Sequence, residues 1–365
     1  MDRVLMKGCE AIAEAAVRAG CRFFAGYPIT PQNEIPEYLS RRMPEVGGAF
    51  IQGESEVASI NMVYGCASTG IRSMTSSSSP GVALKSEGIS FAAAARIPMV
   101  YVNVVRGGPG IGVIQPAQTD YLQAVKASGN GGFRMRVFAP STVQESVDMT
   151  YAAFDYADAD RNPVLVLSDG VVGAMMEPVK LPPMKTEEEI ERIKSSKSAW
   201  ACTGHSLSEK RAWIEPGSWD TGKWECVNKE AYVLYQSWEG DARYEFYQME
   251  DAEVVIASYG ISARIARSAV DLCRSRGIKV GLFRAITVSP FPKQAFEEIN
   301  YRICKGILDV EMSIPPQFLD DVTACVGGRC PIDTCLRSGG NIIHRGAIVE
   351  AVKRVAGQSE EESWN

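Results

Sequence analysis

Three side chains that could bind a ligand or move a proton lie where predicted strands and helices begin or end. Thr30 lies in a Pro-rich segment, Glu56 opens a helical segment, and Arg106 follows an apolar run. In an open α/β sheet, ligands bind at the carboxyl ends of the strands. An Arg beside a Gly-rich loop at such an end is a good anion site, although it could also be a solvated loop residue. These three residues are therefore the first candidates for a functional site.

The segment around Thr30 is predicted to be a stiff loop. Residues 11–22 have apolar side chains at helical spacing, and residues 21–26 are typical of a short buried strand. The chain must then turn, because Gly26 frees the backbone while Pro28 and Pro31 fix φ and remove donors. Thr30 is thus displayed at the carboxyl end of a strand. The alternative is a plain turn before a helix that starts at Pro31.

A second helix is predicted to begin near Glu54 and to end around residues 65–70, which places Glu56 in its first turn. The helix dipole stabilises a carboxylate at that position. Capping of the helix is the ordinary explanation for an acidic first turn. Glu54 is the rival candidate for a functional carboxylate in this segment.

Four motifs resemble the thiamine pyrimidine-binding subunit of the 2-oxoacid:ferredoxin oxidoreductases, most closely the ketoisovalerate or branched-chain type. They are Gly-Tyr-Pro-Ile-Thr-Pro at 26–31, Glu-Ser-Glu at 54–56 followed by Ile-Asn-Met at 60–62, the stretch 75–81, and Val-Val-Arg-Gly-Gly-Pro-Gly at 104–110. The resemblance covers residues 1–180 and continues more weakly from residue 250. One departure is Ile-Pro-Pro-Gln at 314–317, where the family usually has Gly-Gln.

The resemblance implies a thiamine diphosphate site. Glu56 would hydrogen-bond the ring nitrogen of the aminopyrimidine, and its spacing to residues 63–65 matches the family better than that of Glu54. Thr30 would lie over the cofactor and donate its hydroxyl to the substrate. Arg106 would pair with the substrate carboxylate. Besides Glu56 and Thr30, the residues expected to contact the cofactor are Tyr27, Pro28 and Ile29.

Two further motifs are discounted as ligand sites. The glycines of 107–112 follow a strand, but their spacing and the following Ile-Gln-Pro are a poor start for a dinucleotide-binding helix. Ser-Asp-Gly at 168–170 resembles the start of the Mg-diphosphate motif of thiamine enzymes, yet the asparagine that ends this motif is missing. Asp169 is therefore predicted to be a turn residue.

Without that motif, only half of a thiamine site is visible, and the other half should come from a second chain. The resemblance implies a diphosphate-binding subunit, a gamma-type subunit, a ferredoxin-like iron–sulfur subunit and ferredoxin as electron acceptor. Mg²⁺ and the iron–sulfur clusters are expected on these partners, with coenzyme A as co-substrate. The assembly is expected to be a hetero-oligomer, a dimer of the multi-subunit unit.

The ten cysteines contain no Cys-x-x-Cys, and no metal site is predicted on this chain. Cys325, Cys330 and Cys335 are regularly spaced and could bind a cluster or metal with a fourth ligand, which stays open as an alternative. Most other cysteines lie in apolar patterns, where a free thiol behaves as a small hydrophobe in a reducing compartment. Only two histidines are present, so a histidine-based site is not expected.

Composition excludes several classes of protein. The chain has 365 residues, 45% of them hydrophobic, so it can bury two cores. A net charge of −6 without a basic run argues against a nucleic-acid groove. No signal, transit or membrane-spanning pattern is visible, and a cytoplasmic location is expected.

The predicted fold is α/β: a doubly wound parallel sheet at residues 1–185, and a smaller transketolase C-terminal-like α/β domain at residues 250–365. Between them, residues 186–249 are rich in Trp and show no clear period. They are interpreted as an insertion or connection whose aromatic side chains pack on a partner or at the domain boundary, because disordered linkers are poor in Trp.

The expected function is the thiamine-dependent oxidative decarboxylation of a 2-oxoacid with coenzyme A, giving acyl-CoA, CO2 and reduced ferredoxin, with partner chains required. A branched-chain acid such as 2-oxoisovalerate is the first candidate substrate, and 2-oxoglutarate, indolepyruvate or an aryl 2-oxoacid are alternatives. A non-oxidative thiamine 2-oxoacid decarboxylase made of two subunits is a second possible function. A degenerate scaffold subunit is a third, but such a subunit would be expected to lose Glu56 and Thr30.

Overall fold

A large twisted sheet forms the first half of the chain in the computed structural model, which describes residues 3–126, 128–205 and 211–358. Among these residues the sheet has eight strands. Seven follow one another in the order β13 (Thr287–Ser289), β7 (Arg136–Phe138), β8 (Val164–Asp169), β5 (Val100–Gly107), β4 (Ser73–Ser77), β2 (Phe23–Gly26) and β3 (Ala49–Gln52), and β6 (Val113–Pro116) pairs with β5 alone. The strands from β7 to β3 are parallel.

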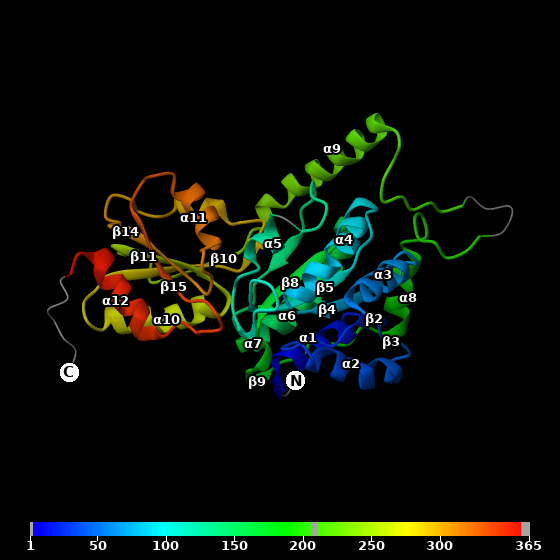
Figure 1. The fold of residues 1–365 in the computed structure, drawn as a ribbon, viewed down its shortest axis with the longest axis horizontal. Coiled ribbons are helices and arrows are strands. Elements are labelled where there is room, and N and C mark those ends of the chain that lie inside the picture. Colours follow the sequence, from blue (N-terminus) through cyan, green and yellow to red (C-terminus); the bar gives the residue numbers. More distant parts are fainter. Residues whose placement is uncertain (1–2, 127, 206–210, 359–365) are drawn as a thin grey trace.

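Helices cover both faces of this sheet, as Figure 1 shows. One face packs against α1 (Gly8–Arg18), α2 (Glu34–Glu45) and α6 (Val143–Asp160), and the other against α3 (Glu56–Ala67), α4 (Pro80–Ala94) and α5 (Tyr121–Val125). Every residue of β4, β5 and β8 is buried, as expected for parallel strands covered on both sides. The expectation of a doubly wound parallel sheet is confirmed.

A second, smaller sheet follows. Its strands lie in the order β10 (Tyr244–Tyr247), β12 (Val280–Ala285), β11 (Val254–Tyr259), β14 (Gly306–Glu311) and β15 (Ile332–Leu336). The helices α10 (Gly260–Arg274) and α12 (Arg345–Ala356) pack on one face, and α11 (Phe318–Val326) with the 3₁₀ turn η2 (Lys293–Glu297) lies on the other. The expected second α/β unit is therefore present.

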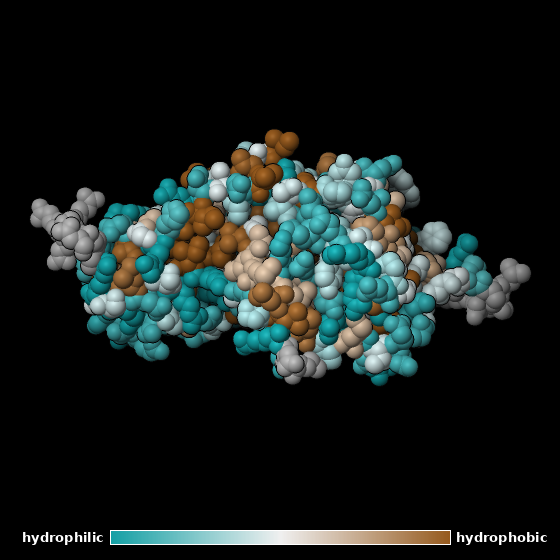
Figure 2. Space-filling view, turned by 90° about the horizontal axis from the view of Figure 1, so that it is seen from below, coloured by the Kyte–Doolittle hydropathy of each residue, from teal (hydrophilic) through white to brown (hydrophobic). Residues whose placement is uncertain are grey.

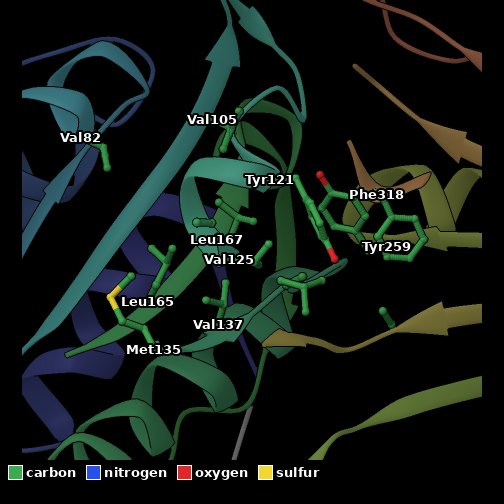
Figure 3. Packing of buried hydrophobic residues seen from close by; sticks show 14 of the residues in the cluster. Val82, Val105, Tyr121, Val125, Met135, Val137, Leu165, Leu167, Tyr259 and Phe318 are labelled. Atoms are coloured by element: carbon green, nitrogen blue, oxygen red, sulfur yellow. The ribbon is translucent and has the colours of Figure 1, made fainter. Parts of the chain in front are cut away.

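The two sheets are joined by shared strands and a shared core. The strand β13 comes from the second half of the chain but pairs with β7 of the large sheet. The rings of Tyr121, Tyr259 and Phe318 lie within 5.1–5.5 Å of one another at the junction (Figure 3). Gln118 adds hydrogen bonds across it, because its amide donates to the Tyr259 carbonyl and accepts from the Met312 N–H.

The segment between the sheets is more regular than its sequence indicates. It contains α8 (Glu187–Ser195), the helix α9 (Thr221–Ser237), which projects from the body in Figure 1, and the 3₁₀ turn η1 (Glu239–Asp241). The sequence shows no hydrophobic periodicity in residues 186–249 and so does not predict these helices. In α9 the reason is that only Ala231 is buried, so the helix lacks an apolar stripe. Trp238 is buried under Arg136, whereas Trp219 is fully exposed.

Two smaller differences concern the N-terminal region. The first helix spans Gly8–Arg18, not residues 11–22, because Gly20 takes a positive φ of 86° just after its end. Ahead of it, β1 (Val4–Lys7) pairs with β9 (Met176–Val179) in a two-stranded ribbon. The short helix α7 (Gly170–Ala174) comes directly before β9 in the chain. Figure 2 looks at this side, where apolar patches alternate with hydrophilic surface.

Candidate functional site

The loop after β2 is held against the neighbouring strand by one buried glutamine. Gln32 donates from Nε2 to the Tyr27 carbonyl at 3.2 Å and accepts from Ser76 Oγ at 2.5 Å. Thr30 is half-buried, and its Oγ1 accepts from Asn33 Nδ2 at 3.4 Å. The following helix begins at Glu34, so the alternative of a helix starting at Pro31 is wrong. Thr30 is fixed at the carboxyl end of β2, as the sequence predicts.

Arg106 lies near the end of β5 and joins two loops. Its Nη1 donates to the Thr30 carbonyl at 3.0 Å, and its Nη2 donates to the Ile111 carbonyl at 2.9 Å. The side chain is 7% exposed, so the alternative of a solvated loop residue is wrong. Its Nε is buried without a hydrogen-bond partner among the described residues. Thr30 and Arg106 are therefore brought together, and the Nε donor of the guanidinium is left over.

Glu56 is the first residue of α3, and Ser55 caps this helix. Ser55 Oγ accepts from the Ala58 N–H at 3.1 Å, so the cap does not depend on Glu56. Glu56 is 6% exposed, whereas Glu54 is exposed. A Cβ added to Gly81 would lie 2.7 Å from Glu56 Oε1 and 2.1 Å from Ser77 Oγ. The carboxylate of Glu56 thus reaches the first turn of α4 beside the end of β4.

Unpaired polar atoms gather where these loops meet. The buried hydroxyls of Ser77 and Ser78 have no hydrogen-bond partner among the described residues. Ser79 follows at a φ of 23°, a conformation that is strained for serine, and its Oγ bonds both the N–H and the carbonyl of Arg106. Buried polar groups normally find partners, so these atoms fit a polar ligand. We call Thr30, Glu56, Ser77, Ser78 and Arg106 the edge site.

Lys85 lies in the core next to the edge site, where it contacts Glu56 and Thr75. This residue of α4 is completely buried, and its Nζ donates to Thr75 Oγ1 at 3.0 Å and to the Glu56 carbonyl at 3.3 Å. Burial lowers the Lys85 pKa to about 7, although the nearby Glu56 charge opposes that shift. Sequence reasoning missed Lys85. The available signal was a single lysine in the otherwise small and apolar run 80–94.

The discounted motifs have other roles. After Gly107 the chain turns back as β6, which pairs antiparallel with β5, so no dinucleotide-binding helix follows. Asp169 ends β8 and caps α7 by accepting from the N–H groups of Val171 and Val172 at 2.8 and 3.1 Å. Burial raises its pKa to about 6. Asp169 is therefore a strand end and a helix N-cap, not the turn residue that the sequence predicts.

The cysteine trio does not converge. Cys325, Cys330 and Cys335 are free thiols, each partly buried. Within the parts of the chain that the structure describes, no three His, Cys, Asp or Glu side chains are grouped so that they could hold a metal ion. The structure therefore gives no support to the alternative of a cluster or metal on the trio.

Fold and site together define an α/β protein with a candidate site for a polar ligand at the carboxyl edge of its larger sheet. A family model described as pyruvate flavodoxin/ferredoxin oxidoreductase, thiamine diphosphate-binding, matches residues 14–214. A second, pyruvate:ferredoxin oxidoreductase core domain II, matches residues 252–348. The chain belongs to the 2-oxoacid:ferredoxin oxidoreductase family and contains its thiamine diphosphate-binding domain.

Curated relatives agree over almost the whole chain. Ketoisovalerate oxidoreductase subunit VorB of Methanothermobacter thermautotrophicus is 44% identical, over 99% of this chain and 100% of its own. 2-Oxoglutarate synthase subunit KorA of Methanocaldococcus jannaschii is 33% identical over 88% and 91%. Pyruvate synthase subunit PorA of Thermotoga maritima is 31% identical over 86% and 82%. The expected family is therefore confirmed.

Solved structures support the fold. The 2-oxoglutarate:ferredoxin oxidoreductase from Magnetococcus marinus, solved with 2-oxoglutarate, coenzyme A and succinyl-CoA bound, matches with a TM-score of 0.80 at 24% identity. The match covers 97% of this chain and 65% of that one. A split-gene transketolase matches with a TM-score of 0.56 at 14% identity, over 96% and 98%. The transketolase-like arrangement of two α/β units is thus confirmed.

Proposed function

We propose that this chain supplies the pyrimidine half of a thiamine diphosphate site in a complex that oxidatively decarboxylates a 2-oxoacid. The observation that carries the proposal is the buried Glu56, whose carboxylate reaches the first turn of α4 beside the unpaired buried donors of Ser77 in β4 and Arg106 in β5. A buried carboxylate in that setting can exchange a proton with a ligand. The products would be acyl-CoA, CO2 and reduced ferredoxin.

Each edge-site residue has a role that its contacts permit. When bound, thiamine diphosphate supplies the electron sink for decarboxylation. Glu56 would hold a proton at the ring nitrogen of the aminopyrimidine. Thr30 would donate its hydroxyl to the substrate, and the free Nε of Arg106 would hold the substrate carboxylate. The backbone at Tyr27, Pro28 and Ile29 would flank the cofactor.

The surface beside the edge site fits a docking chain. Both α3 and α4 carry apolar side chains on their outer surface, namely Val57, Met62, Leu84 and Phe91, each 39–55% exposed. Helices that are apolar all round are normally covered. We assign this surface to the diphosphate-binding subunit, which would bring Mg²⁺ and the rest of the cofactor site.

The remaining partners follow from the family. A gamma-type subunit and a ferredoxin-like subunit with iron–sulfur clusters would complete the unit, two copies of which would pair, and ferredoxin would accept the electrons. A net charge of −6 gives no support for nucleic-acid binding. Across the described residues, no helix combines the length and apolar character needed to span a membrane. A cytoplasmic location remains part of the proposal.

The proposed substrate is a branched-chain 2-oxoacid such as 2-oxoisovalerate. The support is the 44% identity to the VorB subunit across both full chains, compared with 33% for KorA and 31% for PorA over shorter spans. We also propose domain boundaries at residues 185 and 249; the two family models match residues 14–214 and 252–348.

The test is reduction of a low-potential viologen by the natively purified complex, with branched, dicarboxylic and aromatic 2-oxoacids and with or without coenzyme A. Activity that needs both coenzyme A and the complex, and is highest with branched acids, is expected. This chain alone is the control. Decarboxylation independent of coenzyme A would indicate the non-oxidative decarboxylase instead, and preference for another acid would overturn the substrate assignment.

A further inference from the structure

Lys85 is a charged group that the proposed chemistry does not use, although it lies next to the site. Its side chain crosses from α4 to the start of α3 and the middle of β4, and it is completely buried. Burying an ammonium group is costly unless hydrogen bonds and an opposite charge compensate it. Such a residue in the core needs an explanation.

The partners of Lys85 identify that opposite charge. From α3 it meets Glu56, both through the backbone carbonyl at 3.3 Å and through the charge of the carboxylate. From β4 it meets the neutral hydroxyl of Thr75, which itself donates to the Ala25 carbonyl. On its own helix the nearest acidic residue, Glu87, is exposed. Glu56 is therefore the charge that Lys85 faces.

Among the described residues, two hydrogen-bond acceptors are seen for the Lys85 ammonium. An ammonium has three N–H donors, and two are used by neutral oxygens. Gly81 lies one helical turn before Lys85, and its missing side chain leaves room for the Glu56 carboxylate against α4. One helix therefore both leaves space for the Glu56 carboxylate and carries the lysine that bonds the Glu56 carbonyl.

We propose that Lys85 is a positioning residue, which holds Glu56 at the edge site through its hydrogen bond to the Glu56 carbonyl and through attraction of the carboxylate charge. The inference rests on the proposed function, because it concerns the proton that Glu56 would share with the aminopyrimidine. Both groups are buried, and the attraction between opposite charges is stronger in the interior than in water. Because the Lys85 pKa is about 7, the lysine is a cation on the acidic side of neutrality.

The test uses Lys85→Met and Lys85→Gln in the assembled complex. Both variants remove the charge but keep an unbranched side chain, so neither inserts a new shape into the core. Lys197→Met is the matched control, because Lys197 is also a buried lysine but pairs with Asp158 at 2.6 Å, away from the edge site. Glu56→Gln is run in parallel.

Two readouts separate positioning from mere support of the fold. The first is the pH profile of kcat/KM. The second is calorimetry of thiamine diphosphate binding in buffers with different ionisation enthalpies, which counts the protons taken up without any turnover. In both Lys85 variants, the acidic limb of the kcat/KM profile should move upward by about one pH unit or more. The pH below which proton uptake disappears should move upward by a similar amount. Lys197→Met should move neither.

The outcomes distinguish this inference from the proposed function. If Glu56→Gln abolishes proton uptake and turnover while both Lys85 variants keep the wild-type limb, Lys85 is only a core residue and the inference is wrong. If Glu56→Gln keeps full turnover, the proposed function itself fails. An upward shift in one Lys85 variant without the other would also contradict the inference, because both lack the same charge.

Discussion

The two sheets bury acidic groups in different ways. At the edge of the large sheet, Glu56 faces the cation Lys85, which comes from a neighbouring helix. In β14 of the small sheet, Asp309 and Glu311 are completely buried next to each other, and no cation among the described residues offsets them. Burial raises the Glu311 pKa to about 7 and the Asp309 pKa well above its usual range.

The difference shows that burial alone does not mark a functional carboxyl. Glu311 Oε1 accepts from the N–H groups of Gln317, Phe318 and Leu319, so it serves the start of α11. Glu56 is not needed for its helix cap, which Ser55 provides. A buried carboxyl that lies near a cation and does not cap its helix is the better candidate for chemistry. In the β14 pair, by contrast, burial favours the protonated, uncharged form.

The largest effect is expected for Glu56→Gln. Loss of a general acid or base lowers turnover by about two to four orders of magnitude, and the complex should still assemble because Ser55 keeps the helix cap. Steady-state viologen reduction and size-exclusion chromatography check both points. Glu54→Gln is the control, because Glu54 is exposed. An equal loss of turnover in the two variants would show that the buried carboxyl is not the special one.

A smaller effect is expected for Arg106→Ala. Loss of a charged hydrogen bond to the substrate carboxylate should raise KM for the 2-oxoacid by about ten- to a hundredfold, with cofactor content unchanged. Kinetics together with an assay of bound thiamine measure both quantities. Loss of the cofactor would instead show that Arg106 mainly supports the loops at Thr30 and Ile111.

The β14 pair should affect stability and its pH dependence. Because the folded pKa values are raised, the protonated pair stabilises the folded state relative to the unfolded chain. This stabilisation is complete below about pH 4 and is lost as the pH rises through about 7. Asp309→Asn should flatten that loss, whose slope is about 1.4 kcal/mol per pH unit for one proton. Thermal unfolding of the full chain from pH 5 to 8 measures it. An unchanged slope would mean that Asp309 keeps no extra proton in the folded state, and would contradict this account.

The smallest effect is expected for the helix caps. Ser55→Ala and Thr142→Ala each remove a side-chain acceptor from a helix N-terminus, and each should cost about 1 kcal/mol of stability. Only Ser55→Ala should also lower turnover, because it loosens the helix start that carries Glu56. Equal activity in the two variants would show that the cap at Ser55 does not position the carboxylate.

The sequence predicts the parts of the site that depend on local rules. The prolines around Thr30 and the acidic residue after Ser55 place two side chains correctly, and the long apolar run before Arg106 indicates a buried strand. The sequence does not indicate β3, because this edge strand has mostly exposed residues. It does not indicate α9 either, because this helix buries only Ala231 and has no continuous apolar face. Lys85 is missed because its meaning depends on what faces it after folding.

The most direct test of the split site is calorimetric titration of thiamine diphosphate and Mg²⁺ into this chain alone, the purified diphosphate-binding subunit alone, and the two combined. Tight binding with proton uptake is expected only in the combination, and Glu56→Gln should remove the uptake. Stoichiometric, tight binding by this chain alone would contradict the account, because a complete cofactor site would then lie within one polypeptide.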